Sequence, residues 1–109
     1  MFKPLEKDIE RQICDYLAAK GYFFWKQANS GYFDGRTKRF RRHTSPYCIK
    51  GVSDIILILN GRFIGIEVKS ERGRLSEHQE AFRDRVVKAG GLYLVCRSLE
   101  DLVIGLEST

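Results

Sequence analysis

Three charged residues flank a short turn in this sequence, and their types are those of a hydrolytic metal site. Asp54 opens an apolar run, and Glu67 and Lys69 close the next one. Hard divalent cations such as Mg²⁺ prefer carboxylate oxygens as ligands, and a bound cation can polarise a phosphate and lower the pKa of water. A lysine beside them can orient that water or stabilise developing charge. The pattern therefore indicates metal-assisted hydrolysis of a phosphodiester.

The turn between the two runs predicts how these residues face one another. Asn60-Gly61 separates the run 54–59 from the run 62–69, and this dipeptide favours a two-residue type I′ hairpin turn. Such a loop fixes the pairing, so that Asp54 lies directly opposite Glu67 and Lys69 projects from the same face. Both faces of the hairpin are apolar, which predicts that both are covered. We therefore expect the two carboxyl groups to share a proton or to bind a cation.

A purely structural explanation of the same residues stays open. Glu67 and Lys69 would then form a partly exposed ion pair, and turn amides would satisfy Asp54. Gly51, shortly before Asp54, favours the functional interpretation because a glycine lets a backbone or a phosphate approach closely.

Cations gather in the polar stretch before the hairpin. The chain has a formal net charge of +5, and the clustered basic positions are Arg36, Lys38, Arg39, Arg41 and Arg42, with Lys50 closer to the hairpin. Such a cluster can neutralise phosphates and release their counterions. We predict that it binds nucleic acid, with a solvated loop as the alternative.

Aromatic residues accompany the basic stretch. Tyr32, Phe40 and Tyr47 would either stack on unpaired bases or anchor a long loop or a dimer contact. The aromatic run at 22–25 is interpreted as core or interface rather than as a stacking platform.

The rest of the sequence supplies the elements that must position these residues. Periodicity and capping signals predict helices over 5–20, 76–88 and 99–106, and strands over 22–26, 54–59, 62–69 and 92–96. Ser76 and Gln79 form a capping box at the start of the second helix. The stretch 28–50 resists regular assignment. The order αβββαβ, followed by a short helix, predicts an α/β fold with a mixed central sheet flanked by helices.

Length and composition bound the class of protein. At 109 residues the chain predicts a single domain over 1–109. No apolar run approaches a membrane span of about 20 residues, and no signal-peptide pattern is present. Cys14, Cys48 and Cys96 are odd in number and without CxxC spacing, which fits a reducing compartment. His43 and His78 have no partner at zinc-ligand spacing. We expect a soluble, cytoplasmic protein that has no membrane partner.

Several motifs taken together resemble the VRR-NUC (virus-type replication-repair nuclease) family of the PD-(D/E)XK nuclease superfamily. The matching segments are Glu6-x-x-Ile9, Trp25…Asn29-Ser30-Gly31, Gly51-Val52-Ser53-Asp54, Glu67-Val68-Lys69 and Ser76-x-x-Gln79. They follow the family order over approximately residues 5 to 100. Ser53 stands where the superfamily name has proline, and since that proline shapes backbone and does no chemistry, the departure weakens the match only slightly.

The resemblance implies a restriction-endonuclease-like αβββαβ core with the site at one end of the sheet. It implies that Asp54, Glu67 and the Val68 main-chain carbonyl bind Mg²⁺ or Mn²⁺, and that Glu6 completes the site directly or through water. The catalytic set that it implies is Glu6, Asp54, Glu67 and Lys69, with Gln79 as an accessory residue.

The resemblance also implies a substrate and an assembly. Stand-alone members of the family look like homodimers that act on branched DNA such as four-way junctions or flaps. The chain is therefore expected to be a deoxyribonuclease of DNA repair, in the cytoplasm of a bacterium or of a virus-infected host cell.

Competing interpretations remain for single residues and for the whole chain. Glu10 shares a helical face with Glu6 and could replace it by a one-turn shift. The capping box alone explains Gln79. For the chain, the alternatives are a non-catalytic DNA-binding module and a scaffold of a replication or repair assembly. The two carboxylates speak against a pure binder, which gains nothing from burying them.

Overall fold

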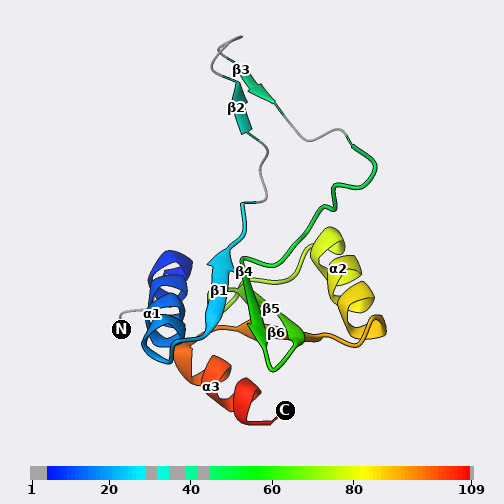
Figure 1. Cartoon of the computed structure of the whole chain (residues 1–109). Helices are drawn as coiled ribbons and strands as arrows, with labels where there is room; N and C mark the ends of the chain where they lie inside the picture. Colours follow the sequence, from blue (N-terminus) through cyan, green and yellow to red (C-terminus); the bar gives the residue numbers. More distant parts are fainter. Residues whose placement is uncertain (1–4, 29–31, 35–38, 42–44, 109) are drawn as a thin grey trace.

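Four strands form a mixed sheet at the centre of the protein (Figure 1). Their spatial order is β1 (Phe23–Lys26), β4 (Ile55–Leu59), β5 (Arg62–Val68) and β6 (Leu92–Cys96). The first three pair antiparallel, and β6 runs parallel to β5. The parallel pair requires a crossover, which α2 (Glu77–Lys88) supplies. The computed structural model describes residues 5–28, 32–34, 39–41 and 45–108, with the backbone alone for 32–34 and 39–41.

The β4–β5 hairpin has the predicted turn and register. Asn60 and Gly61 both have positive φ angles, 54° and 76°, as a type I′ turn requires. Leu57 pairs with Ile64, and Ile55 pairs with Ile66. The regular pairing ends there, so Asp54 precedes β4 and Lys69 follows β5.

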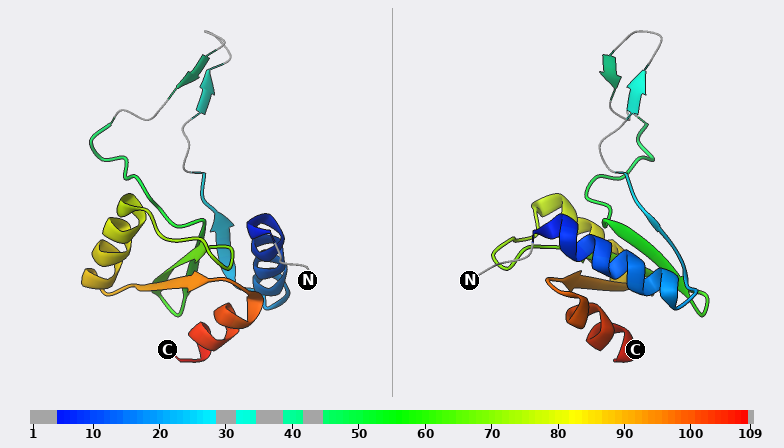
Figure 2. Two further views of the ribbon diagram at one scale, coloured as in Figure 1. Left: turned by 180° about the vertical axis from the view of Figure 1, so that it is seen from behind. Right: turned by 90° about the vertical axis from the view of Figure 1, so that its left-hand side faces the viewer.

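One face of the sheet is covered by α1 (Glu6–Ala19) and α3 (Leu99–Glu107), as Figure 2 shows. Helical spacing on α1 and strand alternation bring apolar side chains into a single core. Its buried members are Ile9, Ile13 and Leu17 of α1, Ile55, Leu57, Ile64, Ile66, Val68 and Cys96 of the sheet, and Leu102 of α3. Cys96 is buried and Cys14 is partly buried, and free cysteines at such positions behave as small apolar residues.

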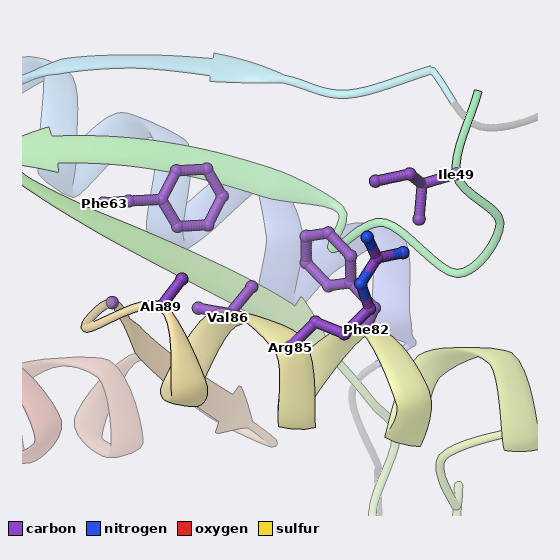
Figure 3. Close-up of a pocket in the computed structure, with 7 residues that line it drawn as sticks. Ile49, Phe63, Phe82, Arg85, Val86 and Ala89 are labelled. Atoms are coloured by element: carbon purple, nitrogen blue, oxygen red, sulfur yellow. The ribbon is translucent and has the colours of Figure 1, made fainter. Parts of the chain in front are cut away.

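The opposite face of β5 and β6 packs on α2. Phe82 of this helix makes edge-to-face contacts with Phe63 of β5 and Tyr93 of β6, at centroid distances of 6.4 and 6.3 Å. A cavity of about 290 Å³ lies between α2 and the hairpin, lined by apolar groups and Arg85 (Figure 3). Phe23 and Trp25 of β1 are 68% and 39% exposed, so these two aromatic side chains are not core residues.

A second, two-stranded sheet lies within the stretch for which no regular structure was predicted. β2 (Tyr32–Asp34) and β3 (Arg39–Arg41) pair antiparallel, with Phe33 opposite Phe40. This hairpin stands away from the four-stranded sheet, beyond the end of β1 (Figures 1 and 2). Three residues per strand are too few to show a period of two in the sequence. Among the described helices, none is both long and apolar enough to cross a membrane.

Candidate active site

Glu67 lies at one end of the sheet with its side chain fully enclosed. It is the penultimate residue of β5 and is 1% exposed. This burial excludes the interpretation of Glu67 as part of a partly exposed ion pair. A carboxyl group at such a position must be hydrogen-bonded, neutralised or paired with a cation.

Asp54 is held beside Glu67 by backbone contacts on both sides. Its Oδ2 accepts a hydrogen bond from the Val68 amide at 2.8 Å, and its main-chain carbonyl accepts one from the Gln27 amide at 2.8 Å. An amide therefore does satisfy one oxygen of Asp54, but it belongs to strand β5 and not to a turn, as the structural explanation had required. The contact also ties the segment that precedes β4 to the end of β5.

The two carboxyl groups are in contact with each other. Burial, a hydrogen bond with Asp54 and the negative charge of Asp54 together raise the pKa of Glu67 from 4.5 to about 8. The charge of Lys69 opposes this change only in part. In the absence of a cation, Glu67 therefore retains its proton at neutral pH.

Two side chains donate to separate oxygens of Glu67. Gln79 Nε2 donates to Oε2 and the Tyr93 hydroxyl donates to Oε1, each at 3.3 Å. Gln79 also forms the predicted capping box with Ser76, in which both reciprocal hydrogen bonds are present. The box and the contact with Glu67 are therefore compatible, because the amide group of Gln79 makes both.

Tyr93 was absent from the residues predicted from the sequence. Its position depends on the register between β5 and β6, which are separated by α2 and have no turn to fix their pairing. The only signal available in the sequence was a tyrosine in an otherwise apolar strand.

Glu6 and Lys69 meet next to the loop that follows β5. Glu6 Oε1 accepts a hydrogen bond from the Ser70 amide at 3.1 Å. A Cβ on Gly73 would lie 3.3 Å from this oxygen and 3.4 Å from Lys69 Cδ, so both side chains border the same small space. Glu10 instead forms an ion pair of 2.7 Å with Lys26. Of the two helix carboxylates, Glu6 is thus the one beside Lys69.

The donor set fits a hydrated divalent cation better than a closed metal cage. Within the part of the chain that the structure describes, no three His, Cys, Asp or Glu side chains gather closely enough to hold a metal ion. Mg²⁺, however, is usually bound by one or two carboxylates together with waters. The proton that Glu67 retains beside Asp54 supplies the positive charge that such a cation would otherwise supply.

The segment before Asp54 packs tightly against the start of α2. Gly51 has a φ of +76°, and a Cβ there would lie 2.4 Å from the carbonyl carbon of His78. The close approach suggested by this glycine is therefore one between two backbones. Ser53, at the position of the superfamily proline, is fully buried and donates to the Ile55 carbonyl at 3.3 Å.

The predicted nucleic-acid-binding residues are placed only in part. Arg36, Lys38 and Arg42 lie outside the described residues. Arg39 and Arg41 belong to β3, of which only the backbone is described. Lys50 is exposed. The stretch that carries them leaves the sheet at Gln27 and returns at Asp54, which are hydrogen-bonded to each other. Both of its ends therefore lie at the site.

This mixed sheet, with the buried Glu67 and the partly buried Asp54 at one end, has the restriction-endonuclease-like α/β fold. A family model for the VRR-NUC domain matches residues 5–100, so the chain belongs to the VRR-NUC domain family. A solved structure titled "VRR_NUC domain" is similar to this chain at 22% identity, with a TM-score of 0.65 over 94% of each chain. A search of curated proteins gave no match. Membership of this family implies a nuclease-type function on DNA, and such domains generally use divalent metals.

Proposed function

We propose that this protein is an Mg²⁺- or Mn²⁺-dependent endonuclease that hydrolyses DNA phosphodiester bonds. The observation that carries the proposal is the contact of the buried Glu67 carboxyl group with the partly buried Asp54 carboxyl group, with Lys69 next to them. Burial of Glu67 against a second acidic group costs stability, and a divalent cation at this point would offset that cost. In this proposal Asp54, Glu67 and the Val68 carbonyl hold the cation.

The side chains around the pair have distinct roles in this proposal. A bound divalent cation would supply Lewis-acid polarisation of the scissile phosphate and a more acidic water. Lys69 stabilises the charge that develops on the phosphate. Glu6 accepts a hydrogen bond from the Ser70 amide and reaches the site through water, and Gln79 supports Glu67.

The decisive experiment is a cleavage panel on plain duplex, nicked, flap and four-way-junction DNA, with Mg²⁺ or Mn²⁺. Asp54→Ala and Glu67→Ala should abolish cleavage while DNA binding is largely retained. Lys69→Ala should lower the rate without loss of metal binding. Full metal-dependent activity of the Asp54→Ala protein would rule the proposal out.

The chain offers a matched pair for the role of Glu6. Glu6→Ala removes a carboxylate beside Lys69, whereas Glu10→Ala removes one on the same helix that is paired with Lys26. We expect a lower cleavage rate for the first variant and an unchanged rate for the second. Equal rates for both variants would exclude Glu6 from the site.

The finer parts of the proposal rest on the resemblance to stand-alone family members. They are a preference for branched DNA, a homodimeric assembly, a single nuclease domain and a cytoplasmic place of action in DNA repair. A preference for the four-way junction in the panel, and a dimer mass in light scattering, would support them. DNA binding without cleavage of any substrate would instead favour a non-catalytic DNA-binding module.

A further inference from the structure

Tyr93 reaches the Glu67 carboxyl group from the neighbouring strand. The parallel pairing of β5 with β6 sets Tyr93 opposite Gly65, and Val95 opposite Glu67. The tyrosine side chain therefore leans along its strand, and its hydroxyl arrives at Glu67 Oε1. Gly65 leaves room for this course, since a Cβ there would already touch the ring of Tyr93 at 3.4 Å.

The ring of Tyr93 is held by α2. Phe82 is 7% exposed and meets the ring edge-to-face, at a centroid distance of 6.3 Å and an interplanar angle of 63°. Aromatic pairs in this arrangement have a preferred geometry. The ring is therefore fixed from the helix side, and the position of its hydroxyl is fixed with it.

Glu67 is thus oriented by two donors from two different elements. Gln79 at the start of α2 holds one oxygen, and Tyr93 of β6 holds the other. A carboxylate oxygen that accepts one hydrogen bond still has a lone pair for a cation. Outer hydrogen bonds of this kind orient metal-binding carboxylates, and their loss typically lowers metal affinity or activity by about 10–100-fold.

We propose that Tyr93 is a positioning residue of this site, whose hydroxyl holds Glu67 in the orientation that binds the divalent cation. This inference rests on the proposed function, and it assigns Tyr93 no contact with DNA. The competing explanation is that the hydroxyl only satisfies a buried carboxyl group. In that case it would affect the stability of the fold and leave metal binding unchanged.

The test uses Tyr93→Phe, which removes one oxygen and keeps the ring contact with Phe82. Calorimetric titration with Mn²⁺ in the absence of DNA should give an affinity about tenfold weaker than that of the wild type. Cleavage should require correspondingly more Mn²⁺, and the KM for DNA should stay the same. Tyr16→Phe is the matched control, because the ring of Tyr16 lies beside Lys20 on α1. It should keep wild-type values in every measurement.

Each outcome has a distinct meaning. A Tyr93→Phe protein with wild-type Mn²⁺ affinity and metal dependence, whether or not its melting temperature changes, would overturn the role of Tyr93 alone. A wild-type protein that binds no Mn²⁺ and cleaves no DNA would overturn the proposed function itself. If Tyr93→Phe does not fold, Phe82→Leu releases the ring and keeps the hydroxyl. Phe82→Leu should weaken Mn²⁺ binding by less than the tenfold factor expected for Tyr93→Phe. A Phe82→Leu protein with wild-type Mn²⁺ affinity would refute the positioning role.

Discussion

Glu67 links the stability of the fold to pH, because its side chain is buried next to another acid. Its pKa rises from 4.5 to about 8 through burial first and the Asp54 contact second. In metal-free protein the stability contributed by this raised pKa is fully present below about pH 4.5. It is lost as the pH rises through about 8, because the unfolded chain releases its proton earlier than the folded one.

We therefore expect Glu67→Gln to be more stable than the wild type above neutral pH in the presence of a chelator. The difference in free energy of unfolding should grow between pH 4.5 and 8 to the order of a few kcal/mol. Urea unfolding across this pH range measures it. Glu107→Gln, which alters an exposed carboxyl group at the end of α3, should leave the pH dependence as it is. Parallel pH profiles for the wild type and Glu67→Gln would contradict the expectation.

At the scale of the elements, the site depends on how three segments lie relative to one another. β5 ends one residue after Glu67, α2 begins at the Gln79 capping box, and the segment before β4 lies against the start of α2 at Gly51. The Gly51 backbone is in the left-handed region and lies against the first turn of α2. A side chain at this position would push Asp54 and Gln79 apart.

Gly51→Ala should therefore lower both stability and cleavage. Gly61 is a matched control, since it has the same φ of +76° but nothing within 4 Å of an added Cβ. Gly61→Ala should cost about 1–2 kcal/mol of backbone strain. Gly51→Ala should cost at least about 1 kcal/mol more, from the steric clash. Thermal unfolding of the two proteins gives the comparison, and equal losses would show that the α2 contact does not matter.

The loop after β5 is held by Arg97, which follows β6. One nitrogen of its guanidinium group donates to the carbonyls of Ser70 and Gly73, each at 2.6 Å. The same loop carries the Ser70 amide that binds Glu6. Arg97 thus ties together the loop whose Ser70 amide binds Glu6.

We expect Arg97→Ala to loosen this loop. Trypsin should cleave faster after the exposed Arg72 and Arg74, and the cleavage of DNA should slow. Arg83→Ala removes an arginine whose ion pairs are with Glu80 and Asp84 of its own helix, and should change neither rate. Mass spectrometry of the tryptic fragments gives the digestion rates of the two variants and of the wild type. If Arg97→Ala is digested at the wild-type rate, Arg97 does not restrain the loop.

Features that depend on residues close together in the chain could be predicted from the sequence. Asn60-Gly61 specified the register that brings Asp54 to Glu67, and the Ser76 to Gln79 spacing specified the start of α2. Contacts between distant segments left no local signal. Tyr93 reaches Glu67 through a strand pairing that no turn fixes, and Arg97 acts on carbonyl groups of a loop. The β2–β3 hairpin was missed because its strands are too short to be periodic.

At the scale of the whole molecule, the two described strands of the basic stretch lie outside the sheet that forms the core. The buried core belongs to α1, α3 and the four-stranded sheet, whereas β2 and β3 form their own sheet (Figure 1). The connection between β1 and β4 nevertheless begins and ends at the site, through the Gln27 amide and the Asp54 carbonyl. Because both ends of the connection lie at the site, we predict that the cations it carries bind DNA near Glu67.

Replacement of Arg36, Lys38, Arg39, Arg41 and Arg42 by glutamine should therefore weaken DNA binding and leave the thermal unfolding of the protein almost unchanged. The net charge falls from +5 by five, to zero. Fluorescence anisotropy at several salt concentrations should show a shallower salt dependence, by roughly 0.9 in the logarithmic slope for each replaced cation that contacts a phosphate. Lys20→Gln with Lys88→Gln removes exposed cations from the C-cap of α1 and from the last turn of α2, and should leave the slope as in the wild type. If the five-fold variant keeps the wild-type slope, phosphates are bound elsewhere on the molecule.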